Sequence, residues 1–156
     1  MRLVIDANIL VAEAVRRRGR DLLAQSLLDL VAEPAWNEAQ HEVRKRLTAM
    51  ERYGHMTADE RRQIEDVAQA AVAVSVRQVP HSIYASVEAI ARERIPRDPD
   101  DWPTVARALV LEAGIWTHDA DFLGCGVPTW TVETLTAHVR RHSSAVADNG
   151  EERERT

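Results

Sequence analysis

The feature that most constrains this chain is its first short run of mostly apolar residues, Arg2-Leu3-Val4-Ile5, which ends at Asp6. A short apolar run without polar alternation is typical of a strand buried on both faces of a parallel sheet. Segments with helical periodicity separate it from later strand candidates. Strands that alternate with helices predict an α/β fold, here a three-layer α/β/α sandwich with a central, mostly parallel, Rossmann-like sheet. The later strands are expected at Leu27–Ala32, Val74–Val79, Ile115–Thr117 and Thr129–Val132.

Capping residues indicate where several helices begin. Asn8 is expected to cap a helix that ends near Arg18, before Gly19. Thr57 and Glu60 have the spacing of a capping box, and Asp101 precedes a helix that tolerates Pro103 in its first turn. The other helices are expected at Asp21–Ser26, Ala35–Met50, Ser82–Arg94 and from Val132 to about His142.

The length favours one domain followed by a tail. A chain of 156 residues can bury a hydrophobic core without disulfide bonds or a structural metal. We assign residues 1–142 to that domain. Ser143 to Thr156 holds almost nothing apolar, so we expect a disordered tail. The single cysteine, Cys125, permits no intrachain disulfide, and no segment has the length of a membrane span. These features predict a cytoplasmic protein.

Acidic residues follow two of the expected strands. Asp6 ends the first strand, while Asp119 and Asp121 come just after Ile115–Thr117. Ligands of open parallel sheets bind at the edge formed by the carboxyl ends of the strands, so these acids belong to one edge. Asp101 begins the helix before that strand, and chain order alone does not decide whether it reaches the same edge. Glu42 lies on a helix and shares a face with Glu38 and Arg46.

Clustered carboxylates predict a site for a hard divalent cation. Mg²⁺ and Mn²⁺ prefer carboxylate and water ligands, and they can activate water and neutralise a phosphodiester. His118 is a solitary histidine within its motif, and the six histidines show no zinc-type spacing. The acid set therefore indicates metal-dependent phosphodiester chemistry.

Four motifs together resemble the PIN-domain ribonuclease family, and in particular its VapC-like toxins. The matching segments are VIDANIL, HEVRKRL, DPDDWPTVARAL and IWTHDADFLGCGVPTWT, in that order, within Met1 to Arg141. The resemblance implies an RNA-cleaving site with Mg²⁺ or Mn²⁺. It implies catalytic roles for Asp6, Glu42, Asp101 and Asp119, of which Asp6, Asp101 and Asp119 would hold the metal. It also implies a homodimer and a small antitoxin protein as partner.

Several neighbours have two interpretations. Asn8 is read as a helix cap and as an orienting partner of Asp6, and the Thr117 hydroxyl as a strand residue that can also orient a metal-bound water. Asp121 either ligates metal or caps a turn.

Other acids lie near the nominated ones. Glu38 is an alternative to Glu42. Asp98 and Asp100, which are close to Asp101 in the sequence, are assigned to the turn. The tryptophans are read as packing residues, with Trp102 the one expected nearest to RNA.

Net charge and two other function classes set limits on this interpretation. A formal charge of −5 argues weakly against nucleic acid, although Arg16–Arg20 and Arg44–Arg46 form basic clusters that either contact phosphates or are solvated helix faces. A phosphatase that uses Asp6 as nucleophile would need a second Asp where this chain has Asn8. A catalytically silent RNA- or protein-binding module is the remaining alternative, and the intact acid set argues against it.

Overall fold

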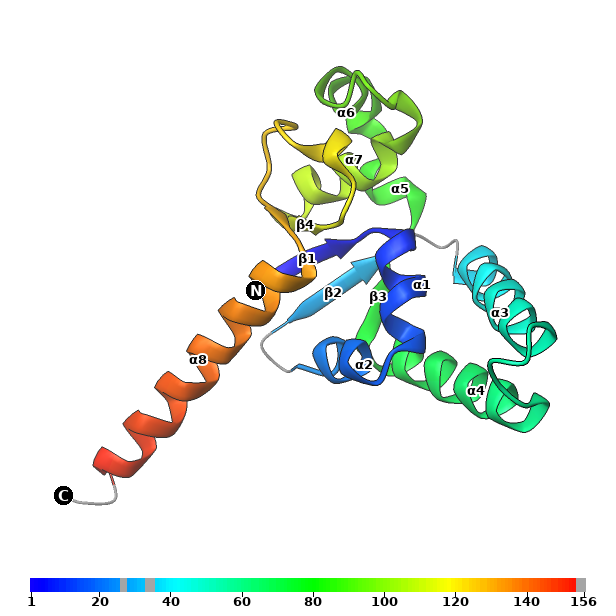
Figure 1. Ribbon diagram of the computed structural model, residues 1–156. Helices are drawn as coiled ribbons and strands as arrows, with labels where there is room; N and C mark the ends of the chain where they lie inside the picture. Colours follow the sequence, from blue (N-terminus) through cyan, green and yellow to red (C-terminus); the bar gives the residue numbers. More distant parts are fainter. Residues whose placement is uncertain (26–27, 33–35, 154–156) are drawn as a thin grey trace.

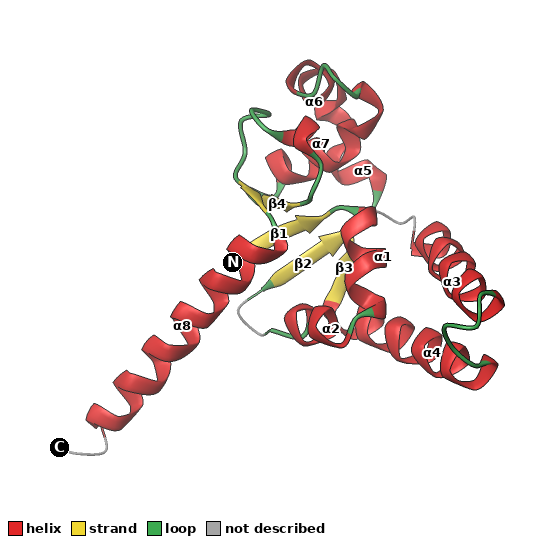
Figure 2. Cartoon of the chain, in the orientation of Figure 1, coloured by secondary structure: helices red, strands yellow, loops and turns green. Residues whose placement is uncertain are grey.

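A computed structural model describes residues 1–25, 28–32 and 36–153. The side chains of residues 29, 31–32, 36–39 and 143–153 are outside that description. The chain forms a sheet with helices on both of its faces (Figures 1 and 2). This is the expected α/β/α sandwich with a parallel central sheet.

The central sheet has five strands in the order β3-β2-β1-β4-β5, and every neighbouring pair is parallel. All five expected strands are present; the second, third and fifth are shorter than predicted, and the fourth is shifted by one residue. Leu27, the predicted start of the second strand, lies outside the described residues. The strands are β1 Arg2–Ile5, β2 Asp29–Ala32, β3 Val76–Gln78, β4 Gly114–Trp116 and β5 Thr129–Trp130.

Alternate residues of β1 and β4 supply the cores on opposite faces of the sheet. Leu3 and Ile5 pack into one buried cluster with Trp116, whereas Val4 and Ile115 pack into the other. All five side chains are buried, which is why these strands read as continuous apolar runs. The two cores fix the register of β1 against β4, and that register brings Ile5 opposite Trp116.

The first helix begins two residues earlier than we predicted. Helix α1 Ala7–Val15 has Asp6 as its N-cap, and the Asp6 side chain accepts a hydrogen bond from the backbone N–H of Asn8. The prediction that Asn8 caps the helix was therefore wrong. The helix ends at Arg16, whose backbone is extended, and α2 Arg17–Leu23 starts at the next residue.

Gly19 lies inside α2 and does not end a helix as we expected. A Cβ atom at Gly19 would lie 2.3 Å from the backbone oxygen of Glu13. The missing side chain lets α2 approach α1 closely, so packing rather than termination explains this glycine. The chain turns at Arg16 instead, where Arg20 N–H donates to the Arg16 carbonyl as the new helix starts.

Helices α3 Trp36–Arg52 and α4 Ala58–Ser75 form a pair that packs against α1. Val43 and Leu47 of α3 bury themselves against Val11 of α1. The predicted capping box is confirmed: the Thr57 hydroxyl accepts from the backbone N–H of Glu60, and the Glu60 carboxylate accepts from that of Thr57. The strand expected from Val74 starts two residues later because α4 continues to Ser75.

The other face is covered by a group of short helices. The helix expected over Ser82–Arg94 is interrupted, giving α5 His81–Tyr84, a 3₁₀ turn at Ala85–Val87 and α6 Glu88–Arg94. A second 3₁₀ turn, Pro99–Asp101, leads directly into α7 Trp102–Val110. This group packs against the sheet through buried side chains, including those of Tyr84, Ala91, Ile95 and Val105.

Helix α8 spans Val132–Arg153 and projects from the body of the domain (Figure 1). Leu135 and Val139, one turn apart, are buried against the sheet. The helix is longer than the one predicted to end near His142, so residues 143–153 have helical backbone. No helix in the described part of the chain is long and apolar enough to span a membrane.

Deletion of residues 143–156 should leave the melting temperature nearly unchanged. The segment has almost no apolar area to bury, because its only residues with aliphatic side chains beyond the β-carbon are Val146 and the stems of two arginines. Differential scanning calorimetry of the full chain and of a chain ending at His142 measures this directly. A decrease of many degrees would mean that the segment docks on the domain.

Candidate active site

Two of the predicted acids are joined by one hydroxyl group. The Thr117 hydroxyl donates to Asp6 Oδ2 at 2.7 Å and accepts from the backbone N–H of Asp119 at 2.9 Å. Thr117 is only 3 % exposed, so these two bonds hold it inside the protein. The backbone N–H of Asp6 donates to the carbonyl of Trp116, which extends the β1–β4 pairing into the site. Asp6 and Asp119 therefore lie side by side at the carboxyl edge of the sheet.

Replacing Thr117 by Val should lower both stability and activity. Val has a similar shape but no hydroxyl, so Asp6 loses a donor and the Asp119 N–H loses its acceptor. The expected loss in unfolding free energy is about 1–2 kcal/mol. Thermal melts and RNA-cleavage rates measure both effects, and Thr117→Ser, which keeps the hydroxyl, should recover most of each. Equal defects in the Ser and Val variants would argue against the hydroxyl bridge.

Asp101 reaches the same acidic edge, a placement that chain order had left open. Helix α7 runs antiparallel to the strands, and its last turn lies at the opposite edge, where Leu111 O accepts from Arg2 Nη1 at 3.3 Å. Its first turn therefore lies over the carboxyl ends. Burial, and then the charges of Asp98, Asp6, Asp119 and Asp121, raise the pKa of Asp101 to about 6.

The Asp101 carboxylate does not cap α7. Asp101 occupies the N-cap position of the helix, but its side chain makes no capping hydrogen bond. The side-chain cap that we expected from an Asp before this helix is therefore not formed. Its partly buried carboxylate is instead surrounded by like charges, an arrangement that costs stability and is typical of functional sites. We call Asp6, Asp101 and Asp119 the acidic cluster.

Arg92 organises the turn that carries Asp101. Its guanidinium donates to Glu88 Oε1 at 2.8 Å and to the carbonyl of Pro99 at 2.9 Å, and it lies 3.4 Å from Asp100 Oδ1. It also lies 5.5 Å from the centroid of the Trp102 ring. Arg92 therefore binds both the turn before Asp101 and the ring after it. Sequence reasoning missed this residue because an arginine on a helix carries no motif.

The neighbouring acids have different positions. Asp98 Oδ1 accepts from the backbone N–H of Asp100 at 3.2 Å, which is the turn role that we predicted for it. Asp100 is 96 % exposed and contacts Arg92. Asp121 donates its N–H to Asp119 Oδ1 at 2.8 Å, and its carboxylate lies 3.7 Å from Arg97. Asp121 thus stabilises the turn after Asp119 and adds negative charge beside Asp101.

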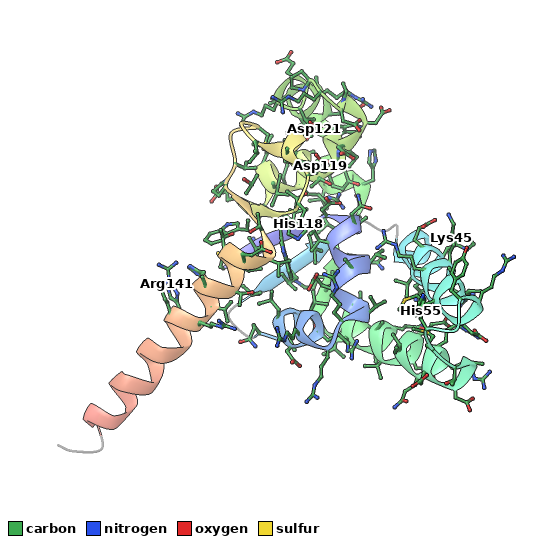
Figure 3. The ribbon with its side chains drawn as sticks, in the orientation of Figure 1. Lys45, His55, His118, Asp119, Asp121 and Arg141 are labelled. Carbon is green, nitrogen blue, oxygen red and sulfur yellow. The ribbon has the colours of Figure 1, made fainter. Side chains whose placement is uncertain are left out.

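Glu42 lies apart from the acidic cluster. Its side chain is 46 % exposed and contacts Lys45 at 3.3 Å. It is not among the carboxylates that raise the pKa of Asp101. In Figure 3, Lys45 lies on the outer helix pair, well away from Asp119 and Asp121. The structure therefore brings together three of the four predicted catalytic acids. The side chain of Glu38, the alternative to Glu42, is outside the described residues.

The cluster fits a hard divalent cation in its chemistry. It offers carboxylate oxygens, the ligands that Mg²⁺ and Mn²⁺ prefer, and its like charges favour a cation that neutralises them. In the part of the chain described, however, no group of three His, Cys, Asp or Glu side chains is arranged closely enough to hold a metal ion. The donors are assembled at one edge, but they do not form a closed coordination sphere.

The tryptophans are packing residues. Trp116 is fully buried, and Trp102 is 8 % exposed and packs against His81 and Tyr84. The Trp102 ring packs into the core beside Asp101, and its expected position as the tryptophan nearest to RNA stays a prediction. Trp130 is half-buried and contacts His138. The side chain of Trp36 lies outside the described residues.

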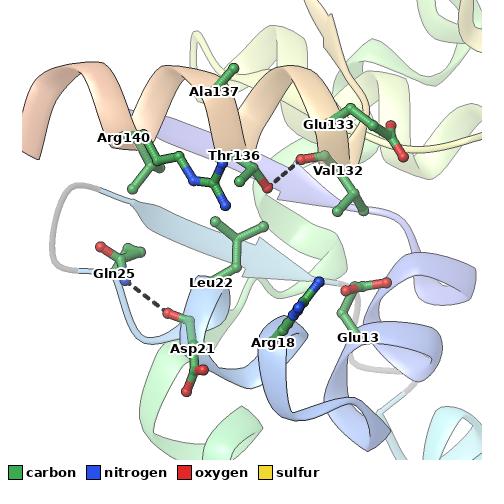
Figure 4. Close-up of a pocket in the computed structure, with 11 residues that line it drawn as sticks. Glu13, Arg18, Asp21, Leu22, Gln25, Val132, Glu133, Thr136, Ala137 and Arg140 are labelled. Atoms are coloured by element: carbon green, nitrogen blue, oxygen red, sulfur yellow. Dashed lines mark hydrogen bonds between the residues drawn. The ribbon is translucent and has the colours of Figure 1, made fainter.

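A separate hollow of about 710 Å³ lies between α2 and the first turns of α8 (Figure 4). Leu22, Val132 and Val139 line it, together with the buried Glu13. None of the three acids of the cluster lines this hollow. Of the first basic group, Arg18 faces it, while Arg16 contacts Glu13 at 3.0 Å and Arg20 donates to the carbonyl of Ala14. Arg16 and Arg20 therefore have local structural partners.

The comparisons with known proteins agree with this architecture. A family model described as the PIN domain matches residues 4–140. The solved structure of FitAB bound to an IR36 DNA fragment is similar in fold, with a TM-score of 0.51 and 13 % sequence identity. The alignment covers 83 % of this chain and 94 % of that chain. A comparison with curated protein sequences found no match. Because the family model spans most of the sequence, including every residue of the acidic cluster, this chain belongs to the PIN domain family.

Proposed function

We propose that the protein is a metal-dependent endoribonuclease that hydrolyses RNA phosphodiester bonds at the acidic cluster. The observation that carries the proposal is the joining of acids from three separate segments at one edge of a parallel sheet. Asp6 and Asp119 share the Thr117 hydroxyl, and both raise the pKa of Asp101. Membership of the PIN domain family, whose members are generally nucleases, supports the same assignment.

Each residue has a defined task in this proposal. Asp6, Asp101 and Asp119 would hold Mg²⁺ or Mn²⁺ through carboxylate oxygens. Such an ion lowers the pKa of bound water and neutralises charge on the phosphoryl oxygens. Thr117 orients the Asp6 carboxylate, and the N–H of Asn8 orients its other oxygen at 3.1 Å. The N–H of Asp121 fixes the Asp119 carboxylate in the same way.

Glu42 is kept as the fourth catalytic acid of the proposal on the strength of its motif. Its ion pair with Lys45 is exposed and therefore weak, so little free energy opposes a change of partner. The Glu42→Gln substitution distinguishes a catalytic role of Glu42 from a role in a surface ion pair alone. A loss of cleavage comparable to that of a cluster variant would place Glu42 in the reaction, and unchanged cleavage would restrict the site to the other three acids.

The test of the proposed activity is metal-dependent cleavage of an RNA pool. We expect cleavage with Mg²⁺ or Mn²⁺ that leaves 5′-phosphate ends, and none in EDTA, because carboxylates alone cannot activate water against a phosphodiester. End-group analysis of the products measures this. Full activity in EDTA would exclude the metal mechanism. Metal binding without any cleavage would favour the alternative, a catalytically silent RNA- or protein-binding module.

The proposed partners follow from the family resemblance. RNA in the cytoplasm is the substrate, and a small antitoxin protein would neutralise the enzyme if it is a VapC-like toxin. We also propose a homodimer. Exposed apolar positions on the helices between Leu22 and Ile64 are the surface that we propose for it. Within that segment Met50 and Tyr53 are 43 % and 75 % exposed, whereas Leu22 itself is buried. Light scattering at micromolar concentration separates the dimer from a monomer.

A further inference from the structure

Two histidines lie one helical turn apart on α8, at the opposite end of the molecule's sheet from the acidic cluster. His138 and His142 have ring centroids 4.1 Å apart and ring planes inclined by 36°. Residues four apart share a face of a helix, so both rings project on the same side. They follow Val132, the first residue of α8, by six and ten residues, roughly 9 and 15 Å along the helix axis. Figure 1 shows α8 passing the N-terminal end of β1.

The ring of His142 is held in a defined orientation. Its Nδ1 lies 2.9 Å from the carbonyl oxygen of His138. A carbonyl only accepts hydrogen bonds, so Nδ1 carries the proton in the neutral ring and Nε2 carries the lone pair. Histidines that bind metals commonly donate their other ring N–H to a backbone carbonyl in this way, which fixes the tautomer and the ring orientation. In its neutral form, His142 therefore presents the Nε2 lone pair to a ligand.

His138 is fixed by packing. It is half-buried, and its ring contacts Trp130 edge-on with centroids 5.1 Å apart. Burial, and then the neighbouring charges of His142 and Arg141, hold its pKa below the ordinary value for histidine. The buried residues Leu135 and Val139 anchor this stretch of α8 to the sheet. Both imidazoles therefore project from a stretch of helix that the core holds in place.

We propose that His138 and His142 form a two-imidazole binding site for a late first-row divalent cation such as Zn²⁺, Ni²⁺ or Cu²⁺, with water completing its shell. Neutral imidazole suits these ions, whereas Mg²⁺ and Mn²⁺ prefer the oxygen ligands of the acidic cluster. The two sites thus differ in position and in metal preference. His138 and His142 have the H-x3-H spacing that zinc ligands use, so the expectation that the histidines show no zinc-type spacing was wrong for this pair. The positive charges of Arg141 and of the Met1 amino group act on His138, and both would oppose the bound cation.

Fluorescence of Trp130 gives a direct measure of occupancy. The full-length protein, in excess Mg²⁺ to saturate the acidic cluster, is titrated with Cu²⁺ or Ni²⁺. We expect saturable quenching, because the open-shell ion would bind beside the ring that contacts His138. Trp130→Phe should reduce the quenching, and what remains would come from Trp116, which lies opposite Trp130 on the neighbouring strand, whereas Trp102 is in the core on the other face of the sheet. In NMR spectra, the ring C–H signals of His138 and His142 should broaden before those of the other histidines.

Histidine variants decide whether both rings bind. His142→Gln should weaken binding by at least roughly tenfold, because the second ligand acts at high effective concentration. His55→Gln is the matched control: His55 is exposed on the turn between α3 and α4, and its loss should change nothing. Equal affinity in the His142→Gln protein, or loss of quenching in an Asp6→Asn protein, would overturn the site. Binding is measured without RNA, so its outcome is independent of the proposed nuclease activity.

Discussion

Asp6→Asn should reduce RNA cleavage by about 10²–10³-fold while leaving the fold intact. The substitution removes one negative charge from the cluster but keeps a side-chain oxygen that can accept from the backbone N–H of Asn8, since Asn caps helices as well as Asp does. Cleavage rates at saturating RNA, with circular dichroism as the check on folding, measure the effect. The matched control is Asp21→Asn on α2, an exposed Asp outside the cluster, which should cleave normally.

Thermal melts of the same two variants test whether Asp6 binds metal. Mg²⁺ stabilises any protein whose folded state alone binds it, so the parent and the Asp21→Asn protein should melt higher in Mg²⁺ than in EDTA. The Asp6→Asn protein should gain much less from Mg²⁺. In its metal-free form, the loss of one repelling charge should stabilise the protein by on the order of 1 kcal/mol. The replacement of the oxygen that accepts from the Thr117 hydroxyl opposes this gain. Destabilisation without metal, together with equal Mg²⁺ shifts in all three proteins, would make Asp6 a structural residue.

The metal-free protein should lose stability as the pH rises from about 4 to about 7, in proportion to the raised pKa of Asp101. That pKa is about 6 in the folded protein, against an ordinary value of 3.8. The folded state therefore binds this proton more tightly than the unfolded chain. The resulting stabilisation is fully present below the ordinary value and is lost as the pH rises through about 6. Asp101→Asn should abolish this dependence and stabilise the metal-free protein at pH 7 by on the order of 1 kcal/mol, allowing for solvent screening.

The same group should make metal binding depend on pH. A carboxylate must be ionised to hold Mg²⁺, so the apparent affinity should fall by up to about tenfold per pH unit below about 6. Calorimetric titrations with Mg²⁺ between pH 5 and 8 measure this. Asp101 is a suitable position for this test, although it lies at the start of a helix. Its side chain makes no capping hydrogen bond, so the substitution removes a charge without removing a helix cap. Asp100→Asn is the matched control. An Asp101→Asn protein with unchanged pH dependence would exclude this carboxylate as its source.

The sequence by itself determined the features that depend on neighbouring residues. The apolar runs at Leu3–Ile5 and Ile115–Trp116 predicted buried parallel strands, and the spacing of Thr57 and Glu60 predicted a capping box. The spacing of apolar residues and the capping of helices depend on residues close in the sequence. They can therefore be recognised without knowing how the helices and strands pack. The four motifs, taken in order, identified the family and nominated Asp6, Glu42, Asp101 and Asp119 for one site, of which the structure brings all but Glu42 to one edge.

Only the tertiary structure decided how those residues meet. The bond between Thr117 and Asp6 joins positions 111 residues apart, and no local pattern specifies it. The direction of α7 placed Asp101 at the acidic edge, while the packing of α3 left Glu42 with Lys45. Asp6 rather than Asn8 became the helix cap because the β1–β4 pairing extends to the Asp6 N–H, which leaves the next residue free to start the helix. Convergence depends on the relative placement of whole elements, which the cores on the two faces of the sheet fix only when the chain is folded.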